Sequence, residues 1–243
     1  MSKLTSIPQL FAHGGAIKAL LTWPRFSITS YNMLAGLRSQ GIIPATVIDV
    51  GANVGQFAIA ASKLFPNAKV HAFEPQPDCF DELQRNCRSL DNVRVYDLAL
   101  GERAGSVVFH VNTHRHSSSL LSLSAAHKSA FPDALESQDI EVTMTTLDDL
   151  MEARALAGPV LLKVDVQGYE PQVLAGATQT LARVDYVILE ASFKPLYEGE
   201  LPFLAVVEQM RTQGFDFLRP VGWLTDPTTT EVLQADALFR RRT

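Results

Sequence analysis

The chain has 243 residues, 47% of them hydrophobic and 19% charged, with a formal net charge of −5. This composition supplies enough apolar side chains for a buried core and excludes a disordered chain. The negative charge argues against nucleic acid as a partner, which would need a concentrated basic face. No apolar run reaches the roughly 18 residues of a membrane span. The only two cysteines, Cys79 and Cys87, lack metal-type spacing, which is typical of a reduced, cytoplasmic protein.

The first 45 residues are weakly patterned and are interpreted as an N-terminal helical extension. Prolines and glycines at positions 8, 14, 15 and 24 break any long helix. Ser30 is a candidate N-cap for a helix that ends at Gly41. We expect residues 1–45 to pack on a second unit, residues 46–243, or to cover its site.

From residue 46 onward, apolar strands alternate with helical segments, which predicts a mostly parallel βαβ sheet. Strands are expected at 46–50, 69–73, 93–98, 160–164 and 186–189. Helices are expected at 55–65, 78–90, 170–182 and 202–213, and a further helix is expected to begin near residue 146. The segments 215–219 and 236–240 are expected to form an antiparallel pair at the sheet edge. The fold class is therefore α/β, with an antiparallel edge strand and helices on both faces.

The alternation is interrupted by an insertion at residues 106–145. It contains two expected strands, 106–111 and 141–145, and a polar segment between them, 112–139. Insertions of this length in α/β enzymes are usually lids or substrate loops. Its histidines are candidate bases and its serines candidate ligand contacts or helix caps: His114, His116, Ser118 and Ser119.

Five acids fall at or next to the carboxyl ends of the predicted strands: Asp49, Glu74, Asp97, Asp165 and Glu190. Ligands of open α/β sheets bind beyond these strand ends. Buried carboxylates are costly unless they are paired or bind a ligand. The row of acids therefore predicts a ligand site at this edge of the sheet.

The loop that follows Asp49 carries two glycines, Gly51 and Gly55, on either side of Asn53. A strand, a tight turn and a helix N-terminus open many nucleotide-binding domains. A dinucleotide site needs further glycines around its pyrophosphate, and they are missing here. S-adenosylmethionine (SAM) has no pyrophosphate, and Asp49 and the loop amides suit its amino-acid end. Glu74 stands 23 positions after Gly51 (74 − 51), near the offset of an acid that binds a ribose diol.

Several motifs together resemble the FkbM family: Val47–Gly55, Phe73–Pro75, Ala99–Gly101, Ser118–Leu120, Leu147-Asp148, Leu162–Glu170 and Asp236–Phe239. Members of that family are SAM-dependent methyltransferases of the class I (Rossmann-like) fold that typically methylate hydroxyls. The resemblance covers roughly residues 45–240. It implies SAM binding by Asp49, Gly51, Asn53, Gly55 and Glu74, with Asp97 and Leu98 near the adenine.

Two residues of the fourth predicted strand region, Lys163 and Asp165, point to the same face because they lie two apart. A lysine in a buried strand needs a partner, so we expect Lys163 to pair with Asp165 or Glu190. Our hypothesis is that Asp165 positions or deprotonates an acceptor hydroxyl, assisted by Lys163 and Glu190. The alternative is a structural ion pair. Asp165 and Glu190 could also hold a divalent metal, but no third ligand is evident and no metal is predicted.

The favoured interpretation is a SAM-dependent methyltransferase that acts on an oxygen of a small molecule or saccharide. One alternative is an NAD(P)-dependent oxidoreductase, which the missing glycines disfavour. Another is a SAM-binding module without catalysis. The sequence does not identify the acceptor, and its composition is compatible with a homo-oligomer.

Overall fold

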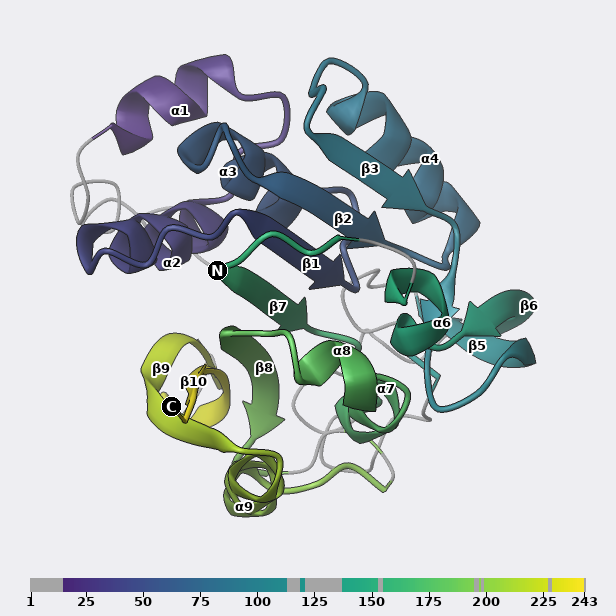
Figure 1. Ribbon diagram of the computed structural model, residues 1–243. Helices are drawn as coiled ribbons and strands as arrows, with labels where there is room; N and C mark the ends of the chain where they lie inside the picture. Colours follow the sequence, from purple (N-terminus) through teal and green to yellow (C-terminus); the bar gives the residue numbers. More distant parts are fainter. Residues whose placement is uncertain are drawn as a thin grey trace.

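The computed structural model describes residues 15–112, 119–120, 137–152, 155–194, 197, 199–226 and 229–242. These residues form a seven-stranded sheet with helices on both faces, and a smaller three-stranded sheet beside it (Figure 1). His114, His116 and Ser118, which the sequence singled out, lie outside the described residues.

The strand order of the large sheet is β3-β2-β1-β7-β8-β10-β9. Its parallel strands are β1 (Thr46–Val50), β2 (Lys69–Phe73), β3 (Val93–Tyr96), β7 (Val160–Val164) and β8 (Tyr186–Ser192). The antiparallel pair at the edge consists of β9 (Phe215–Thr225) and β10 (Val232–Arg241). The predicted α/β fold is confirmed. Because the chain leaves β1 toward β2 and later returns to β7 on the other side, the strand order reverses between β1 and β7, where ligands of such sheets bind.

Helices cover both faces of this sheet. One face carries α2 (Ile28–Ser39), α3 (Gln56–Leu64) and α4 (Pro77–Cys87), with α1 (Ala16–Thr22) packed on α2. The other carries α6 (Leu147–Met151), α7 (Glu170–Ala175), α8 (Thr178–Leu181) and α9 (Phe203–Thr212). Leu34 and Leu37 of α2 are fully buried in the apolar cluster of the first face. The cap of α2 is Ser27, whose hydroxyl accepts a hydrogen bond from the Ser30 amide, so the predicted cap at Ser30 is wrong by three residues.

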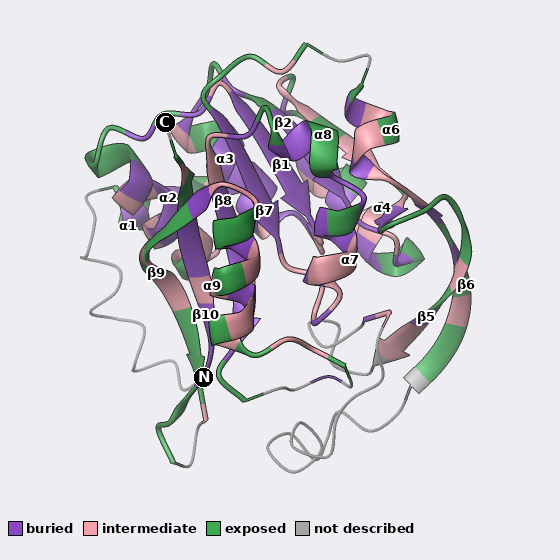
Figure 2. Ribbon diagram, turned by 60° about the horizontal axis from the view of Figure 1, so that its bottom comes forward, coloured by how far each residue is buried: buried purple, intermediate pink, exposed green. Residues whose placement is uncertain are grey.

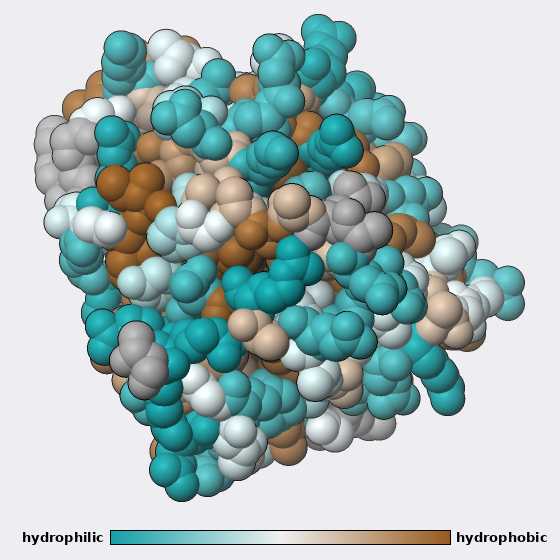
Figure 3. Space-filling model, in the orientation of Figure 1, coloured by the Kyte–Doolittle hydropathy of each residue, from teal (hydrophilic) through white to brown (hydrophobic). Residues whose placement is uncertain are grey.

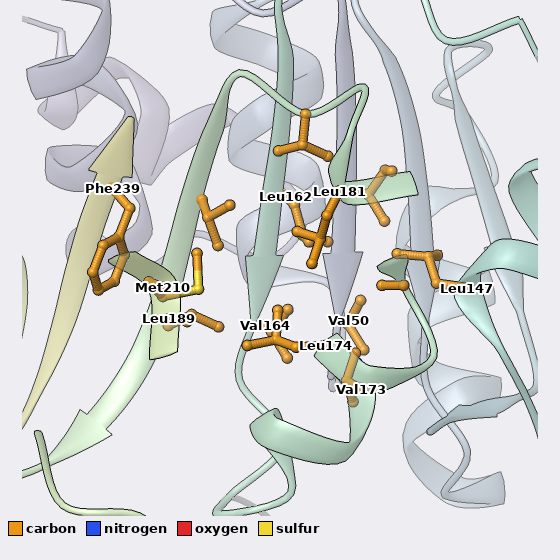
Figure 4. Close-up of a cluster of buried hydrophobic side chains, with 14 of the residues drawn as sticks. Val50, Leu147, Leu162, Val164, Val173, Leu174, Leu181, Leu189, Met210 and Phe239 are labelled. Carbon is orange, nitrogen blue, oxygen red and sulfur yellow. The ribbon is translucent and has the colours of Figure 1, made fainter. Parts of the chain in front are cut away.

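The core lies between the sheet and its helices, and the central strands are buried along their length (Figure 2). On the face of α6 to α9, strand side chains meet helix side chains (Figure 4): Val50, Leu162, Val164, Leu189 and Phe239 with Leu147, Leu174, Leu181 and Met210. The outer face drawn in Figure 3 is mostly hydrophilic, with small apolar patches between polar side chains. No helix in the described part of the chain is long and apolar enough to cross a membrane.

Three predicted elements differ from the structure. The two strands predicted in the insertion are present but longer, as β5 (Gly105–Asn112) and β6 (Ser137–Thr145); β6 pairs with β5 on one side and with β4 (Ala99–Leu100) on the other, in the small sheet. The helix predicted at 170–182 is two helices, α7 and α8, because Gly176 lies between them against residue 101: a Cβ at Gly176 would be 1.9 Å from a backbone oxygen. Strand β8 continues to Ser192, so Glu190 lies inside the strand instead of at its end.

Candidate active site at the carboxyl edge of the sheet

The loop between β1 and α3 folds back on itself through three left-handed residues. Gly51, Asn53 and Gly55 have φ angles of 81°, 49° and 96°. Asn53 tolerates this conformation better than most residues because its short side chain bonds locally, and its Oδ1 accepts a hydrogen bond of 2.7 Å from the Val54 amide. The two glycines and the asparagine of the sequence motif are thus required by the turn itself.

Gly51 also sets how closely β1 and β7 approach at the switch point. A Cβ on Gly51 would lie 1.9 Å from the backbone oxygen of Asp165 and 2.9 Å from its carbonyl carbon. The loop after β1 therefore packs directly on the loop after β7. This contact brings together Gly51, predicted to bind the cofactor, and Asp165, predicted to act in catalysis.

Glu74 ties the end of β2 to the same loop. One carboxylate oxygen accepts a hydrogen bond of 2.8 Å from the Asn53 amide, and the other accepts one of 2.9 Å from the Gln76 amide. Burial raises the pKa of Glu74 to about 7, although the two amides lower it, and the negative charges of Asp49 and Asp165 raise it further. The carboxylate thus lies beside the glycine loop, where the sequence placed it.

Lys163 holds the acids of β1 and β7 together. Its Nζ lies 3.0 Å from Asp165 Oδ2 and 3.7 Å from Asp49 Oδ1. The expected pair with Asp165 is confirmed, and the approach to Asp49 was not predicted. Asp49 is fully buried and its two oxygens lack a hydrogen bond of normal geometry from the described residues. Burial raises its pKa to about 6 against the opposing effect of Lys163.

The catalytic candidates Asp165 and Glu190 are joined by Gln167, a residue of the Leu162–Glu170 motif to which the sequence assigned no role. Gln167 Nε2 donates to Asp165 Oδ1 at 2.8 Å and to Glu190 Oε2 at 2.7 Å, and Gln167 Oε1 accepts from the Tyr197 hydroxyl at 2.6 Å. Burial raises the pKa of Glu190 well above its ordinary value, and the negative charge of Asp165 adds to this. Of the two partners predicted for Lys163, Asp165 is the one in contact, and Glu190 is joined to Asp165 through Gln167.

A further acid, Asp236, extends the row across the sheet. It lies opposite Glu190 in the register of β8 and β10, and beside Gly222 of β9. A Cβ on Gly222 would lie 2.2 Å from an Asp236 oxygen. Asp236 belongs to the Asp236–Phe239 motif, which gave it no role; the local signal for one is that Gln234 and Asp236 interrupt the apolar run from Val232 to Phe239.

The remaining predicted residues lie at the margins of this site. Asp97 directly follows β3 and is exposed, while Leu98 is partly buried. Ser119 is fully buried, and its hydroxyl donates to the Gln167 backbone oxygen at 2.6 Å, so it holds the loop after β7 instead of capping a helix. Within the described residues, no group of three histidines, cysteines or acids is placed to hold a metal ion.

Glu170, the first residue of α7, is 4% exposed, and its carboxyl group binds the loop after β7. Its Oε1 accepts hydrogen bonds from the Val166 amide at 2.9 Å and the Gly168 amide at 3.3 Å. Burial raises the pKa of Glu170 to about 8, although hydrogen bonds from its own amide and from the Val166 amide lower it, and the negative charges of Asp165 and Glu200 raise it further. The carboxyl group therefore keeps its proton in the folded protein at a pH where the unfolded chain has lost it.

This raised pKa gives a test by substitution. Between pH 4.5 and 8 the folded state binds more protons at Glu170 than the unfolded state, so the free energy of unfolding falls as pH rises, by up to about 1.4 kcal/mol per pH unit from this group. Glu170→Gln keeps an acceptor for the two amides and has no proton to lose. We expect denaturant unfolding at pH 5 to 9 to show a shallower decline for the variant and greater stability above pH 8. Equal slopes would contradict the raised pKa.

Comparison with known proteins bears on this geometry. Residues 49–217 match the family model described as the methyltransferase FkbM domain. The chain is 30% identical over 168 residues to the 2-O-methyltransferase NoeI of Sinorhizobium fredii, covering 67% of this chain and 69% of that protein. It is 34% identical to the hexuronic acid methyltransferase AglP of Haloferax volcanii, over 58% of this chain and 54% of that protein.

A third relative is the 31-O-demethyl-FK506 methyltransferase FkbM of Streptomyces tacrolimicus. It is 31% identical, over 70% of this chain and 72% of that protein. Among solved structures, the N-terminal domain of EvdMO1, crystallised in the presence of SAH and D-fucose, superposes with a TM-score of 0.50. That match covers 88% of this chain and 83% of the other at 9% identity, so it shows the fold alone.

Proposed function

Because this chain belongs to the FkbM methyltransferase family, we propose that it transfers the methyl group of SAM to a hydroxyl of a small molecule, with a saccharide as the favoured acceptor. The observation that carries the proposal is the family match over residues 49–217, which spans the glycine loop and the loop after β7. The family assignment leaves no place for the NAD(P)-dependent oxidoreductase considered from the sequence.

The residues around the loop fit SAM by their charge. SAM carries a sulfonium and an ammonium group, and three carboxylates lie near the loop. Besides burial, the negative charges of Asp49 and Asp165 raise the pKa of Glu74, and that of Asp165 raises the pKa of Asp49. Asp49 has lone pairs that the described residues leave without a hydrogen bond of normal geometry. A pyrophosphate would meet repulsion from the same acids. We assign Glu74 to the ribose and Asp49, through the loop, to the amino-acid end.

The chemistry asked of the protein is modest. When bound, SAM supplies a methyl group already activated on a sulfonium. The chain has to align an acceptor oxygen with that methyl group and to receive the hydroxyl proton. Asp165 is suited to this because its side chain is 31% exposed while Lys163 holds its other side. As the acceptor oxygen gains the methyl group, Asp165 takes the proton, and Lys163 stabilises the carboxylate beforehand.

The choice of a hydroxyl on a saccharide is supported by the relatives. One is named a 2-O-methyltransferase and another a hexuronic acid methyltransferase. The acidic strand ends of this chain suit an acceptor rich in hydroxyl donors, since carboxylates accept such hydrogen bonds. The acceptor itself is part of the proposal and is open to test.

The experiment has two stages. Calorimetry with SAM, and separately with NADH, measures cofactor binding; we expect binding of SAM only. Incubation with methyl-labelled SAM and a panel of monosaccharides, uronic acids and other hydroxyl compounds, followed by NMR of the product, locates the methyl group. Binding of NADH in place of SAM would overturn the cofactor assignment, and a product methylated on nitrogen or carbon would overturn the acceptor assignment.

Glu74→Gln tests the assigned ribose contact. A charge-assisted hydrogen bond contributes about 1.5 kcal/mol or more, so we expect the dissociation constant of SAM to rise about tenfold. The pKa of Glu74 is raised to about 7, and ribose hydroxyls bond best to its ionised form. The affinity of the unmodified protein should therefore weaken more steeply as pH falls from 8 to 6 than that of the variant, in which only Asp49, with a pKa of about 6, still titrates at the assigned SAM contacts. Glu208→Gln, exposed on α9, is the control, and an unchanged affinity in Glu74→Gln would remove the contact.

A further inference from the structure

Gln167 has a backbone conformation that is unusual for a glutamine. Its φ angle is 59°, and Gly168 follows at 97°. Outside glycine, this left-handed region is adopted mainly by asparagine and aspartate, and such residues gather where function requires them. The buried Ser119 hydroxyl, which bonds to the Gln167 backbone oxygen at 2.6 Å, helps to keep the conformation. A glutamine held in this way points to a requirement for its side chain.

Both the nitrogen and the oxygen of the Gln167 carboxamide make hydrogen bonds. Its nitrogen donates to Asp165 of the loop after β7 and to Glu190 of β8, at 2.8 and 2.7 Å. Its oxygen accepts from the hydroxyl of Tyr197, which is 1% exposed. Because the amide oxygen only accepts, the Tyr197 hydroxyl must donate, and this contact sets the amide so that both N–H groups face the two acids.

This arrangement fixes the plane of the Asp165 carboxylate. Lys163 Nζ bonds to Oδ2 at 3.0 Å, and Gln167 Nε2 bonds to Oδ1 at 2.8 Å. With one donor on each oxygen, the carboxylate cannot rotate without losing a charge-assisted hydrogen bond. The exposed 31% of the Asp165 side chain is therefore presented to an incoming hydroxyl in one direction.

We propose that Gln167 is a positioning residue for methyl transfer, which orients the Asp165 carboxylate and couples it to Glu190 through one carboxamide. The proposal rests on the proposed function, in which Asp165 receives the hydroxyl proton. Glutamine suits the position because asparagine is one methylene shorter. Glutamate has the same length but would set a third carboxylate against two others.

The kinetic test uses a double-mutant cycle. Gln167→Met keeps the length of the side chain and removes the NH2 group and the oxygen of its amide. We expect it to lower kcat about 10- to 100-fold and to change the dissociation constant of SAM less than about twofold. If Gln167 acts through Asp165, the same change made in the Asp165→Asn variant should cost less than about threefold further, because coupled residues are not additive. An equal loss in both backgrounds would overturn the proposal.

A second readout does not depend on the acceptor. Carbon-13 NMR of labelled carboxyl groups follows the titration of Asp165 and Glu190 in the protein without ligands. Hydrogen bonds to an ionised carboxylate favour the ionised form, so loss of the Gln167 amide in Gln167→Met should raise the apparent pKa values of this pair. The charged neighbours Lys163, Glu170 and Asp236 are retained in the variant, and because Glu170 interacts with both acids its signal is followed in the same titration.

The two readouts separate the proposal from the proposed function. An unchanged titration would overturn the role of Gln167 whatever the enzyme methylates. A shifted titration without any methyl transfer by the unmodified protein would support the coupling and count against the proposed function. Gln167→Gly, which adopts the left-handed backbone freely, serves if the methionine variant does not fold. Thr230→Gly is the matched control, since Thr230 has a φ angle of 62° and lies exposed in the β9–β10 hairpin; its kinetics should be unchanged.

Discussion

Asparagine in place of Asp165 is expected to lower kcat about 10²- to 10⁴-fold, the range in which a positioned general base contributes to a rate. Asparagine has nearly the same shape and keeps an oxygen that can accept from Gln167. An asparagine cannot take a proton from a hydroxyl. Its neutral amide also cannot balance the charge of Lys163, whose Nζ lies 3.0 Å from the Asp165 carboxylate. Single-turnover methyl transfer with saturating acceptor measures the chemical step directly.

The affinity for SAM separates this role from a structural one. Lys163 keeps a second acid at 3.7 Å, Asp49, so the fold around the glycine loop should persist and the dissociation constant of SAM should change less than about threefold. Asp216→Asn is a matched control: it removes a 2.7 Å ion pair with Arg242 at the opposite edge of the sheet and should leave turnover unchanged. If Asp165→Asn turns over normally, the contact with Lys163 is an ion pair that only supports the fold.

Patterns local in sequence were enough to predict the parallel strands. In β1 and β7 every residue is buried, and such continuous apolar runs are typical of strands covered on both faces. The glycine loop was predictable for a related reason, because its backbone conformation selects glycine and asparagine directly. Asp49 and Glu74 were found because strand ends on one edge of a sheet meet in space.

What the sequence could not predict depends on contacts between distant segments. The break between α7 and α8 follows from the close approach of Gly176 to residue 101, which is 75 positions away (176 − 101). Asp148 lies in the first turn of α6, but its carboxylate also accepts from the Gln179 and Thr180 amides of α8, a contact that no local pattern predicts. Gln167 was missed because a single polar residue in a loop has no period, and its partners come from β8 and from the loop that carries Tyr197.

Gly51→Ala is expected to be among the most damaging single changes to this protein, and the comparison with Gly41→Ala shows why. Both glycines are left-handed, at φ angles of 81° and 78°. A Cβ at Gly41 has no atom of the described residues within 4 Å, whereas one at Gly51 would lie 1.9 Å from the Asp165 backbone oxygen. Gly41→Ala should therefore lower the free energy of unfolding only by the cost of a left-handed alanine, about 1–2 kcal/mol.

At Gly51 the same cost of the left-handed backbone applies, and the new Cβ also clashes with backbone atoms of Asp165. Backbone atoms cannot avoid the clash by changing a rotamer. Either the loop after β1 or the loop after β7 has to move, and each carries part of the site. We expect Gly51→Ala to lower the free energy of unfolding by several kcal/mol, a large share of the roughly 5–15 kcal/mol that hold a protein folded. The melting temperature should fall by at least about 6 °C more than in Gly41→Ala. SAM binding measured on the folded fraction should be lost in Gly51→Ala and kept in Gly41→Ala. Equal melting temperatures with SAM binding intact would mean that the two loops do not approach as closely as described, and that the positions of Asp49 and Asp165 are not set by this contact.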